Sequence, residues 1–174
     1  MDEVTRTAAQ CRHYAMCKID FLDTGLCASG PAKGYVAYYP QGRMDIYAAL
    51  AQGVIPVTPG LVDIAETCTL CGICEKQCHF VTGLRPGQVM EALKRAVADH
   101  LAAGLEVVSP PADPLLDELQ AIVGPQWASN DPAILISYAH DPYPFKEAQM
   151  PRCVVLPGST EQVAAVVRLA RERQ

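Results

Sequence analysis

The sequence predicts an α+β chain in which a mainly helical, cysteine-rich first part is followed by a strand and a helix. Seven of the eight cysteines lie within residues 1–108, where apolar residues also recur at helical spacing. A Ser-Pro-Pro stretch at 109–111 marks a join. We therefore expect three segments: a domain over residues 1–108, a linker with a short helix over 109–150, and the start of an incomplete second domain over 151–174.

Start and stop signals predict three helices in the first part. The first covers residues 43–52 and ends before Gly53. The second opens at Thr58, which is suited to cap a helix that begins with proline, and it runs toward Cys68. The third covers residues 87–103 and has the strongest helical periodicity. Its apolar positions are Met90, Leu93, Val97 and Leu101.

In the second part, the pattern predicts a helix over 115–123, a solvated acidic linker around Asp141, and a buried strand over 153–156. Ser159 and Gln162 form a capping-box pattern, so a last helix is expected to follow. Its expected inward residues are Val163, Val166, Val167 and Ala170. Because a single strand and helix have no sheet to join, we expect this part to be incomplete.

Composition and charge exclude several classes of protein. The net charge of −5, without clusters of lysine or arginine, argues against a nucleic-acid surface. No apolar run approaches the ~20 residues of a membrane span, and the first residues lack the features of a signal peptide. A cytoplasmic protein is therefore expected. In that reducing compartment, eight cysteines are more typical of metal ligands than of disulfides.

The main motif is a run of four cysteines with C-x2-C-x2-C-x3-C spacing. Its members are Cys68, Cys71, Cys74 and Cys78. This is the spacing of the bacterial iron–sulfur motif, in which three thiolates hold one cluster and the fourth can ligate another. A structural zinc site is the alternative, but zinc motifs usually pair two C-x2-C knuckles separated by a dozen or more residues. We therefore predict a [4Fe–4S] cluster at this run.

The N-terminal cysteines follow the same spacing in part. Cys11 and Cys17 occupy its first and third positions, while Tyr14 and Phe21 occupy the second and fourth. Cys27 follows in a glycine-bounded segment that can bend back. Buried or incidental thiols are the alternative, but three cysteines within seventeen residues, in frame with the main motif, favour metal ligation.

Two clusters would use all seven of these cysteines if the main run supplied ligands to both of them. The first centre, a [4Fe–4S] cluster, would take Cys27, Cys68, Cys71 and Cys74. The second would take Cys11, Cys17 and Cys78. Three thiolates without a fourth suit a [3Fe–4S] cluster, or a [4Fe–4S] cluster with a non-cysteine corner.

Two histidines beside these motifs and one cysteine far from them have two interpretations each. His13 and His79 flank proposed ligands, so they could donate hydrogen bonds to cluster sulfurs, although solvated histidines are the alternative. Cys153 lies in an apolar strand pattern, and we expect it to be a small core residue rather than a ligand.

The pair Cys11 and Cys17, together with Cys78, resembles the ligand set of the three-iron centre in the iron–sulfur subunits of succinate dehydrogenase and fumarate reductase. The present chain has the two motifs in the opposite order. Cys27, the proposed fourth ligand of the first centre, follows Cys17 by ten residues. His79 rather than proline follows Cys78. The resemblance implies a three-iron cluster as one option for the second centre.

From about Leu115 onward, the sequence resembles the opening of an FAD-linked oxidase domain of the glycolate oxidase and D-lactate dehydrogenase kind. The matching stretches are 119–124, 131–132, 138–141, 151–157, 159–163 and 168–171. The resemblance implies the first strand and helix of a flavin domain. The glycine-rich loop that holds the FAD pyrophosphate is then expected beyond Gln174.

The first part resembles the ferredoxin-like modules that are fused or coupled to such oxidases, and those of the heterodisulfide reductase type. The shared order is the stretch 40–44, a short helix and then the cysteine run. Together the resemblances imply a two-cluster ferredoxin-like domain followed by the first strand and helix of an FAD-binding domain.

The function that these resemblances imply is electron transfer from flavin to an acceptor, within an FAD-dependent oxidoreductase that oxidises a 2-hydroxy acid or a similar substrate. FAD would be held by a continuation of the polypeptide or by a flavin-binding partner chain, and a redox partner protein would take the electrons. We therefore expect no substrate turnover by this chain alone. Two alternatives stay open: a stand-alone iron–sulfur carrier subunit of a quinone- or disulfide-reductase complex, and a zinc-stabilised interaction module.

Overall fold

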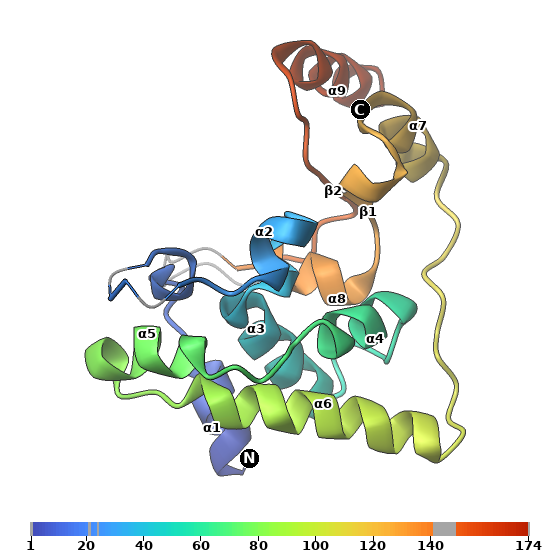
Figure 1. The fold of residues 1–174 in the computed structure, drawn as a ribbon. Helices are drawn as coiled ribbons and strands as arrows, with labels where there is room; N and C mark the ends of the chain where they lie inside the picture. The colour runs from blue at the N-terminus through green and yellow to red at the C-terminus, as the bar shows by residue number, and fades with distance from the viewer. Residues whose placement is uncertain (1, 21, 24, 141–148, 174) are drawn as a thin grey trace.

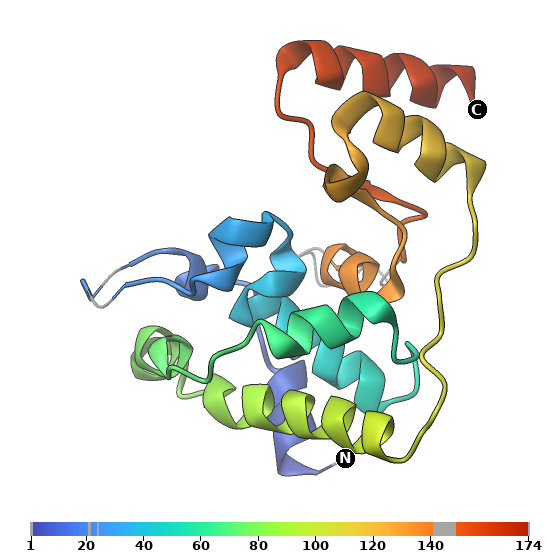
Figure 2. The same cartoon turned by 45° about the vertical axis from the view of Figure 1, so that its right-hand side comes forward.

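A computed structural model describes residues 2–20, 22–23, 25–140 and 149–173 of the chain. These residues are mainly helical and include one small two-stranded sheet, which is compatible with the predicted α+β class. Figures 1 and 2 both show a larger lower body of helices and a smaller upper layer. An extended segment along one side, over residues 104–113, connects the two.

The lower body contains five of the longer helical segments. They are α1 (Glu3–Ala9), α3 (Pro40–Ala51), α4 (Pro59–Glu66), α5 (Ile73–Thr82) and α6 (Pro86–Ala102). The short helix α2 (Ser29–Lys33) and the 3-10 turns Met16–Lys18 and Val36–Tyr38 connect them. Helix α3 packs against α1, α4 and α6, and its Ile46 is fully buried.

The three helices predicted for the first part are present. Helix α3 begins three residues before the predicted start, because Pro40 is tolerated in the first helical turn. At the start of α4, the Thr58 hydroxyl accepts a hydrogen bond from the Leu61 N–H at 3.1 Å, as the capping pattern predicts. In α6, three of the four predicted apolar positions are buried, but Leu101 is exposed because it lies in the last turn of the helix.

Part of the predicted linker belongs to the core of the lower body. Helix α8 (Pro132–Leu135) and the 3-10 turn Ile136–Tyr138 lie where the sequence predicts only connecting chain. Ile134 and Ile136 are buried in one cluster with Ile46 and Ile64. A four-residue helix is too short to produce a helical pattern, which explains the difference. The predicted solvated linker around Asp141 lies outside the described residues.

The upper layer contains α7 (Pro114–Val123), α9 (Thr160–Glu172) and the sheet of β1 (Ala128–Ser129) and β2 (Val154–Val155). The strands are antiparallel, and Ala128 lies opposite Val155. The predicted strand over 153–156 is therefore present, but the expectation that it has no sheet to join is wrong. Its partner has two residues, which is too short to show the alternation of a strand.

Helix α9 begins as predicted, with the Ser159 hydroxyl accepting a hydrogen bond from the Gln162 N–H at 3.3 Å. The prediction of its buried face is wrong in part. Val166 packs against the α7 side of the layer, but Val163, Val167 and Ala170 are exposed, Val167 to 62%. Because α7 covers only one side of α9, a narrower apolar stripe is buried than the pattern predicts.

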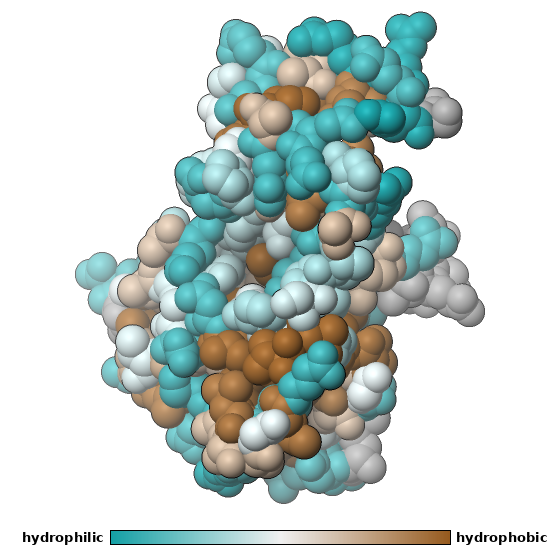
Figure 3. All heavy atoms as spheres, turned by 90° about the vertical axis from the view of Figure 1, so that its right-hand side faces the viewer, coloured by the Kyte–Doolittle hydropathy of each residue, from teal (hydrophilic) through white to brown (hydrophobic). Residues whose placement is uncertain are grey.

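Apolar side chains gather on the lower half of the face drawn in Figure 3. The exposed large apolar residues near the C-terminal ends of α3 and α6 are Val54, Leu101, Leu105 and Val108. Within the described part of the chain, no helix is both long enough and apolar enough to cross a membrane.

Candidate metal centres

The main cysteine run lies on the connection from α4 into α5. Leu70 and Gly72 both have positive φ angles, +54° and +77°, and these two turns direct the chain into α5. A Cβ at Gly72 would meet no atom within 4 Å, so the positive φ, rather than crowding, accounts for glycine there. Cys74 and Cys78 then lie one turn apart on α5, where side chains four residues apart are neighbours.

Four of the predicted ligands line one open cavity of about 530 Å³. They are Cys27, Cys68, Cys71 and Cys74. Cys27 reaches this cavity from the segment before α2, more than forty residues ahead of the main run. This is the set of residues that the sequence assigns to the first centre.

A smaller pocket of about 40 Å³ lies beside the first cavity. It is lined by four cysteines: Cys11, Cys17, Cys74 and Cys78. The sequence assigns three of these to the second centre, and Cys74 borders both cavities. Tyr14 lies between Cys11 and Cys17 and also lines the pocket, while Phe21 lies outside the described residues.

The electrostatic interactions among the thiols follow the same division. Burial is the main cause that raises the pKa of Cys11 to about 11, with smaller contributions from the charges of Asp45, Cys17 and Cys78. Burial also raises the pKa of Cys74 to about 12, and there the additional repulsion comes from the other three thiols of the first cavity. The thiols that act on Cys11 and on Cys74 are therefore members of the same predicted centre in each case.

Cys27 has the opposite shift. Burial opposes its ionisation, but hydrogen bonds from Ser29 and Gly30 and the positive charge of Arg43 outweigh that effect. The pKa of the Cys27 thiol is therefore below its ordinary value. Because a thiolate, not a thiol, binds metal, this environment favours the ligating form of Cys27.

The donor chemistry of both cavities fits iron–sulfur clusters. Sets of thiols are the ligands that such clusters use, and soft thiolates select iron–sulfur clusters, zinc or copper(I) over hard cations. Among the described residues, no three histidine, cysteine or acidic side chains converge on one point that could hold a single metal ion. In the first cavity the fit rests on thiols that surround a space, rather than on a preformed site for one ion. The second pocket has room for only a few waters, so its fit rests on the set of thiols alone.

The two histidines near the motifs bind other groups. His13 Nε2 lies 2.8 Å from Asp45 Oδ1, and this hydrogen bond raises the pKa of His13 although burial opposes the change. His79 Nδ1 lies 3.1 Å from the carbonyl oxygen of Leu84. The hydrogen bonds described for these histidines thus go to oxygen rather than to cysteine sulfur. Cys153 is half-buried against the α7–α9 core, in agreement with its predicted packing role.

Arg43 and Ser29 both contact Cys27, and the cysteine motifs do not indicate either residue. Arg43 Nη1 lies 3.7 Å from Cys27 Sγ, and Ser29 Oγ lies 3.3 Å from the same sulfur. A signal for Arg43 was available, since it lies three residues before Ile46 and therefore on the buried face of the predicted helix. A charged residue in such a position points to a buried polar function.

Comparisons with known proteins identify no family. No protein-family model matches the sequence, and neither the curated proteins nor the solved structures include a significant match to it.

Proposed function

We propose that this chain is the iron–sulfur electron-transfer part of an FAD-dependent oxidoreductase that oxidises a 2-hydroxy acid or a similar substrate. The observation that carries the proposal is the division of seven cysteines between two neighbouring cavities. Three border only the first cavity (Cys27, Cys68, Cys71), three only the second (Cys11, Cys17, Cys78), and Cys74 borders both. Spacing in the sequence predicts the same division independently.

The chain's own part in this function is to hold two redox groups side by side. Cys74 and Cys78 are one turn apart on α5, so their Cβ atoms are expected about 5–6 Å from each other. One helical turn therefore contributes to both sites. When bound, each cluster would carry one electron at a time, which is the chemistry that connects a two-electron flavin to a one-electron acceptor.

The second site supports either of two cluster types. Tyr14 occupies the second position of the motif, where a cysteine would complete a set of four thiols, and its exposed side chain lines the pocket. Three thiolates suit a [3Fe–4S] cluster, and a [4Fe–4S] cluster there would need a fourth ligand other than cysteine.

The flavin part of the proposal rests on the resemblance of residues 115–171 to the opening of an FAD-linked oxidase domain. Strand β2, the turn at Pro157-Gly158 and the capped helix α9 are compatible with it. FAD would be held by further polypeptide or by a partner chain, and this chain would conduct electrons without turning over substrate by itself.

Anaerobic purification from the native host tests both parts of the proposal. We expect a brown protein with iron and acid-labile sulfide in the amounts of two clusters, and an EPR signal after reduction. A colourless protein that holds zinc and has no EPR signal in either oxidation state would overturn the proposal in favour of a zinc-stabilised module.

The flavin part has a separate readout in the same preparation. We expect bound FAD, and reduction of the clusters when glycolate or lactate is added. Clusters without flavin, unaffected by 2-hydroxy acids, would favour the stand-alone carrier subunit of a quinone- or disulfide-reductase complex.

A further inference from the structure

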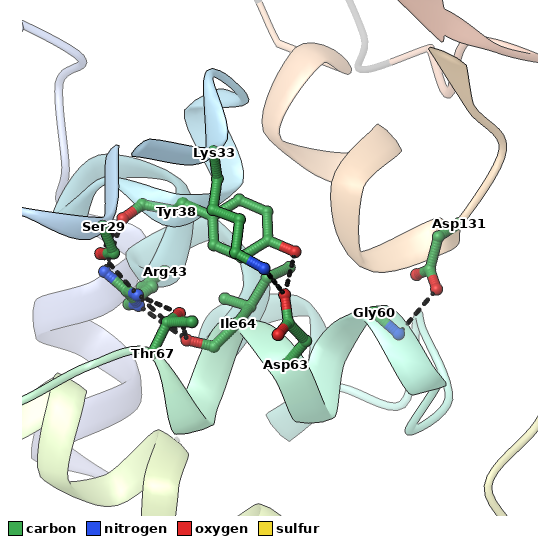
Figure 4. A network of polar contacts seen from close by, with 9 residues as sticks. All are labelled: Ser29, Lys33, Tyr38, Arg43, Gly60, Asp63, Ile64, Thr67 and Asp131. Atoms are coloured by element: carbon green, nitrogen blue, oxygen red, sulfur yellow. Dashed lines mark hydrogen bonds and ion pairs between the residues drawn. The ribbon is translucent and has the colours of Figure 1, made fainter. Parts of the chain in front are cut away.

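Arg43 is a fully buried cation on α3, with 0% of its surface exposed. Its Nε and Nη2 donate to the carbonyl oxygen of Ile64 at 3.1 and 3.0 Å, and its Nη1 donates to that of Tyr38 at 2.6 Å. Nη2 also donates to the hydroxyls of Ser29 and Thr67, at 3.0 Å each (Figure 4). All of these acceptors are electrically neutral, so they orient the guanidinium without balancing its charge.

Among the described residues, Arg43 also contacts the sulfur of Cys27. Nη1 lies 3.7 Å from Cys27 Sγ, and the Ser29 hydroxyl, which Arg43 holds, lies 3.3 Å from the same atom. Both Arg43 and Cys27 line the first cavity. The guanidinium is therefore connected to one proposed cluster ligand directly and through a hydroxyl.

A buried guanidinium costs free energy unless an anion faces it. None of the ion pairs found among the described residues includes Arg43. The Asp63 carboxylate, in the same network, instead accepts hydrogen bonds from Lys33 Nζ at 2.8 Å and from the Tyr38 hydroxyl at 2.5 Å (Figure 4). The charge of Arg43 also helps to lower the pKa of Asp63, but the hydrogen bonds described for that carboxylate come from Lys33 and Tyr38. An anionic cluster in the first cavity would place a counter-charge next to the guanidinium, through Cys27.

We propose that Arg43 is a positioning residue that holds Cys27 as a ligand of the first centre and raises the reduction potential of that centre. The inference rests on the proposed function, because it needs a cluster in the first cavity. Reduction adds one electron, and hence one negative charge, without forming or breaking a bond. A buried cation beside a ligating sulfur stabilises the reduced state more than the oxidised one, since net charge and hydrogen bonds to sulfur set the potential.

Arg85 offers a matched control. It lines the same cavity, but its side chain is 63% exposed and pairs with Glu75 at 3.2 Å. Water and salt screen an exposed charge, so its effect on the potential is expected to be small.

Redox titration with dithionite, followed by EPR, tests the inference in the cluster-loaded chain. In Arg43→Met, the ratio of reduced to oxidised first centre at a fixed potential should fall about tenfold, which is about 59 mV for a one-electron couple. Arg43→Lys should recover part of the shift, because it keeps the charge but not the forked geometry. Arg85→Gln should change the ratio less than twofold. An unchanged midpoint in Arg43→Met that holds its full iron content would overturn the inference.

A second measurement does not depend on the folding of Arg43→Met. In protein labelled with ¹⁵N-arginine, pulsed EPR of the reduced first centre should detect a coupled nitrogen. The signal should persist in Arg85→Gln. Loaded protein without this coupling would overturn the inference alone, whereas wild-type protein that holds no iron would overturn the proposed function and the inference together.

Discussion

The carboxylate of Asp131 accepts a hydrogen bond from the buried hydroxyl of Thr58, with 2.7 Å between Oδ1 and Oγ1. The same carboxylate accepts the backbone N–H groups of Gly60 at 3.0 Å and Ala133 at 2.9 Å, and Figure 4 shows it facing Gly60. One buried side chain therefore serves the first turns of both α4 and α8. This contact connects the segment over residues 131–139 to the lower body.

Replacing Asp131 with alanine should lower the free energy of unfolding by about 2–3 kcal/mol. The loss combines about 1 kcal/mol for a helix cap with the cost of leaving the buried Thr58 hydroxyl and backbone donors without an acceptor. Urea unfolding, compared at equal m-value, measures the change. The exposed residue Asp117 on α7 supplies the control, and Asp117→Asn should change stability by less than about 0.5 kcal/mol. Equal losses in the two variants would show that Asp131 has no special role.

Gly42 in α3 should be intolerant of even a methyl group. A Cβ at this position would lie 2.3 Å from the carbonyl oxygen of Val36 and 2.5 Å from the Cα of Ala37. Both atoms are backbone and cannot rotate away, so Gly42→Ala must separate α3 from the preceding turn. We expect a loss of about 2–3 kcal/mol, the range of overpacked sites, measured by urea unfolding.

Gly87 in α6 is the matched control for Gly42. A Cβ there would approach the end of the Glu75 side chain at 3.1 Å, and a carboxylate on a flexible side chain can move. Gly87→Ala should therefore change stability little, or increase it by up to about 1 kcal/mol through helix propensity. If Gly42→Ala were tolerated as well as Gly87→Ala, the close approach of α3 to the turn would be refuted.

Asp63 should make a pH-dependent contribution to stability. Partial burial opposes its ionisation, but hydrogen bonds from Lys33 and Tyr38 outweigh that effect and hold the pKa of the carboxyl below its ordinary value. Because the folded-state pKa is the lower one, ionised Asp63 stabilises the fold above the ordinary carboxyl range. That contribution is lost as the pH falls through the folded-state pKa.

Comparing Asp63→Asn with wild type at each pH measures this contribution. The variant should be less stable near pH 7, by under about 1 kcal/mol because the side chain is 43% exposed and screened by solvent. The difference should shrink toward about pH 3, below the ordinary aspartate pKa of ~3.9. A difference that grew as the pH fell would mean that the sign of the interaction is wrong.

Helices with local signals could be predicted from the sequence, whereas elements stabilised by distant contacts could not. The cap at Thr58 and the proline after it define the start of α4 without reference to any other part of the chain. Helix α8 is different, because its place depends on Asp131 binding residues about seventy positions earlier. The exposed Val163 and Val167 show the same limit, since periodicity predicts an apolar face but not how much of it a neighbour covers.

The candidate site divides in the same way. Cysteine spacing predicts the main assignments of thiols to the two cavities, and the turns between Cys68 and Cys78 that separate the members of the run are local. The contacts of Arg43 and Ser29 with Cys27 are tertiary, and no spacing rule connects them. Cys74 lining both cavities also follows from the packing of α5, not from the motif.

Single cysteine variants should separate the two centres. Cys71 borders only the first cavity and Cys78 only the second, although both belong to one eleven-residue motif. If the run supplies ligands to both centres, Cys71→Ser should remove the EPR signal of the first centre and leave that of the second. Cys78→Ser should do the reverse, because the serine hydroxyl is a poor substitute for a thiolate.

Cys153→Ser is the control for these variants, because Cys153 lies in the α7–α9 core away from both cavities. It should keep the iron content and both EPR signals of the wild type, at a small cost in stability. If Cys71→Ser and Cys78→Ser lost the same signal, all four cysteines of the run would serve one cluster, and the assignment of Cys78 to the second centre would be refuted. If each lost its own signal, Cys74 and Cys78 would be assigned to different centres although they are one helical turn apart, and α5 would be the element that sets the distance between the two clusters.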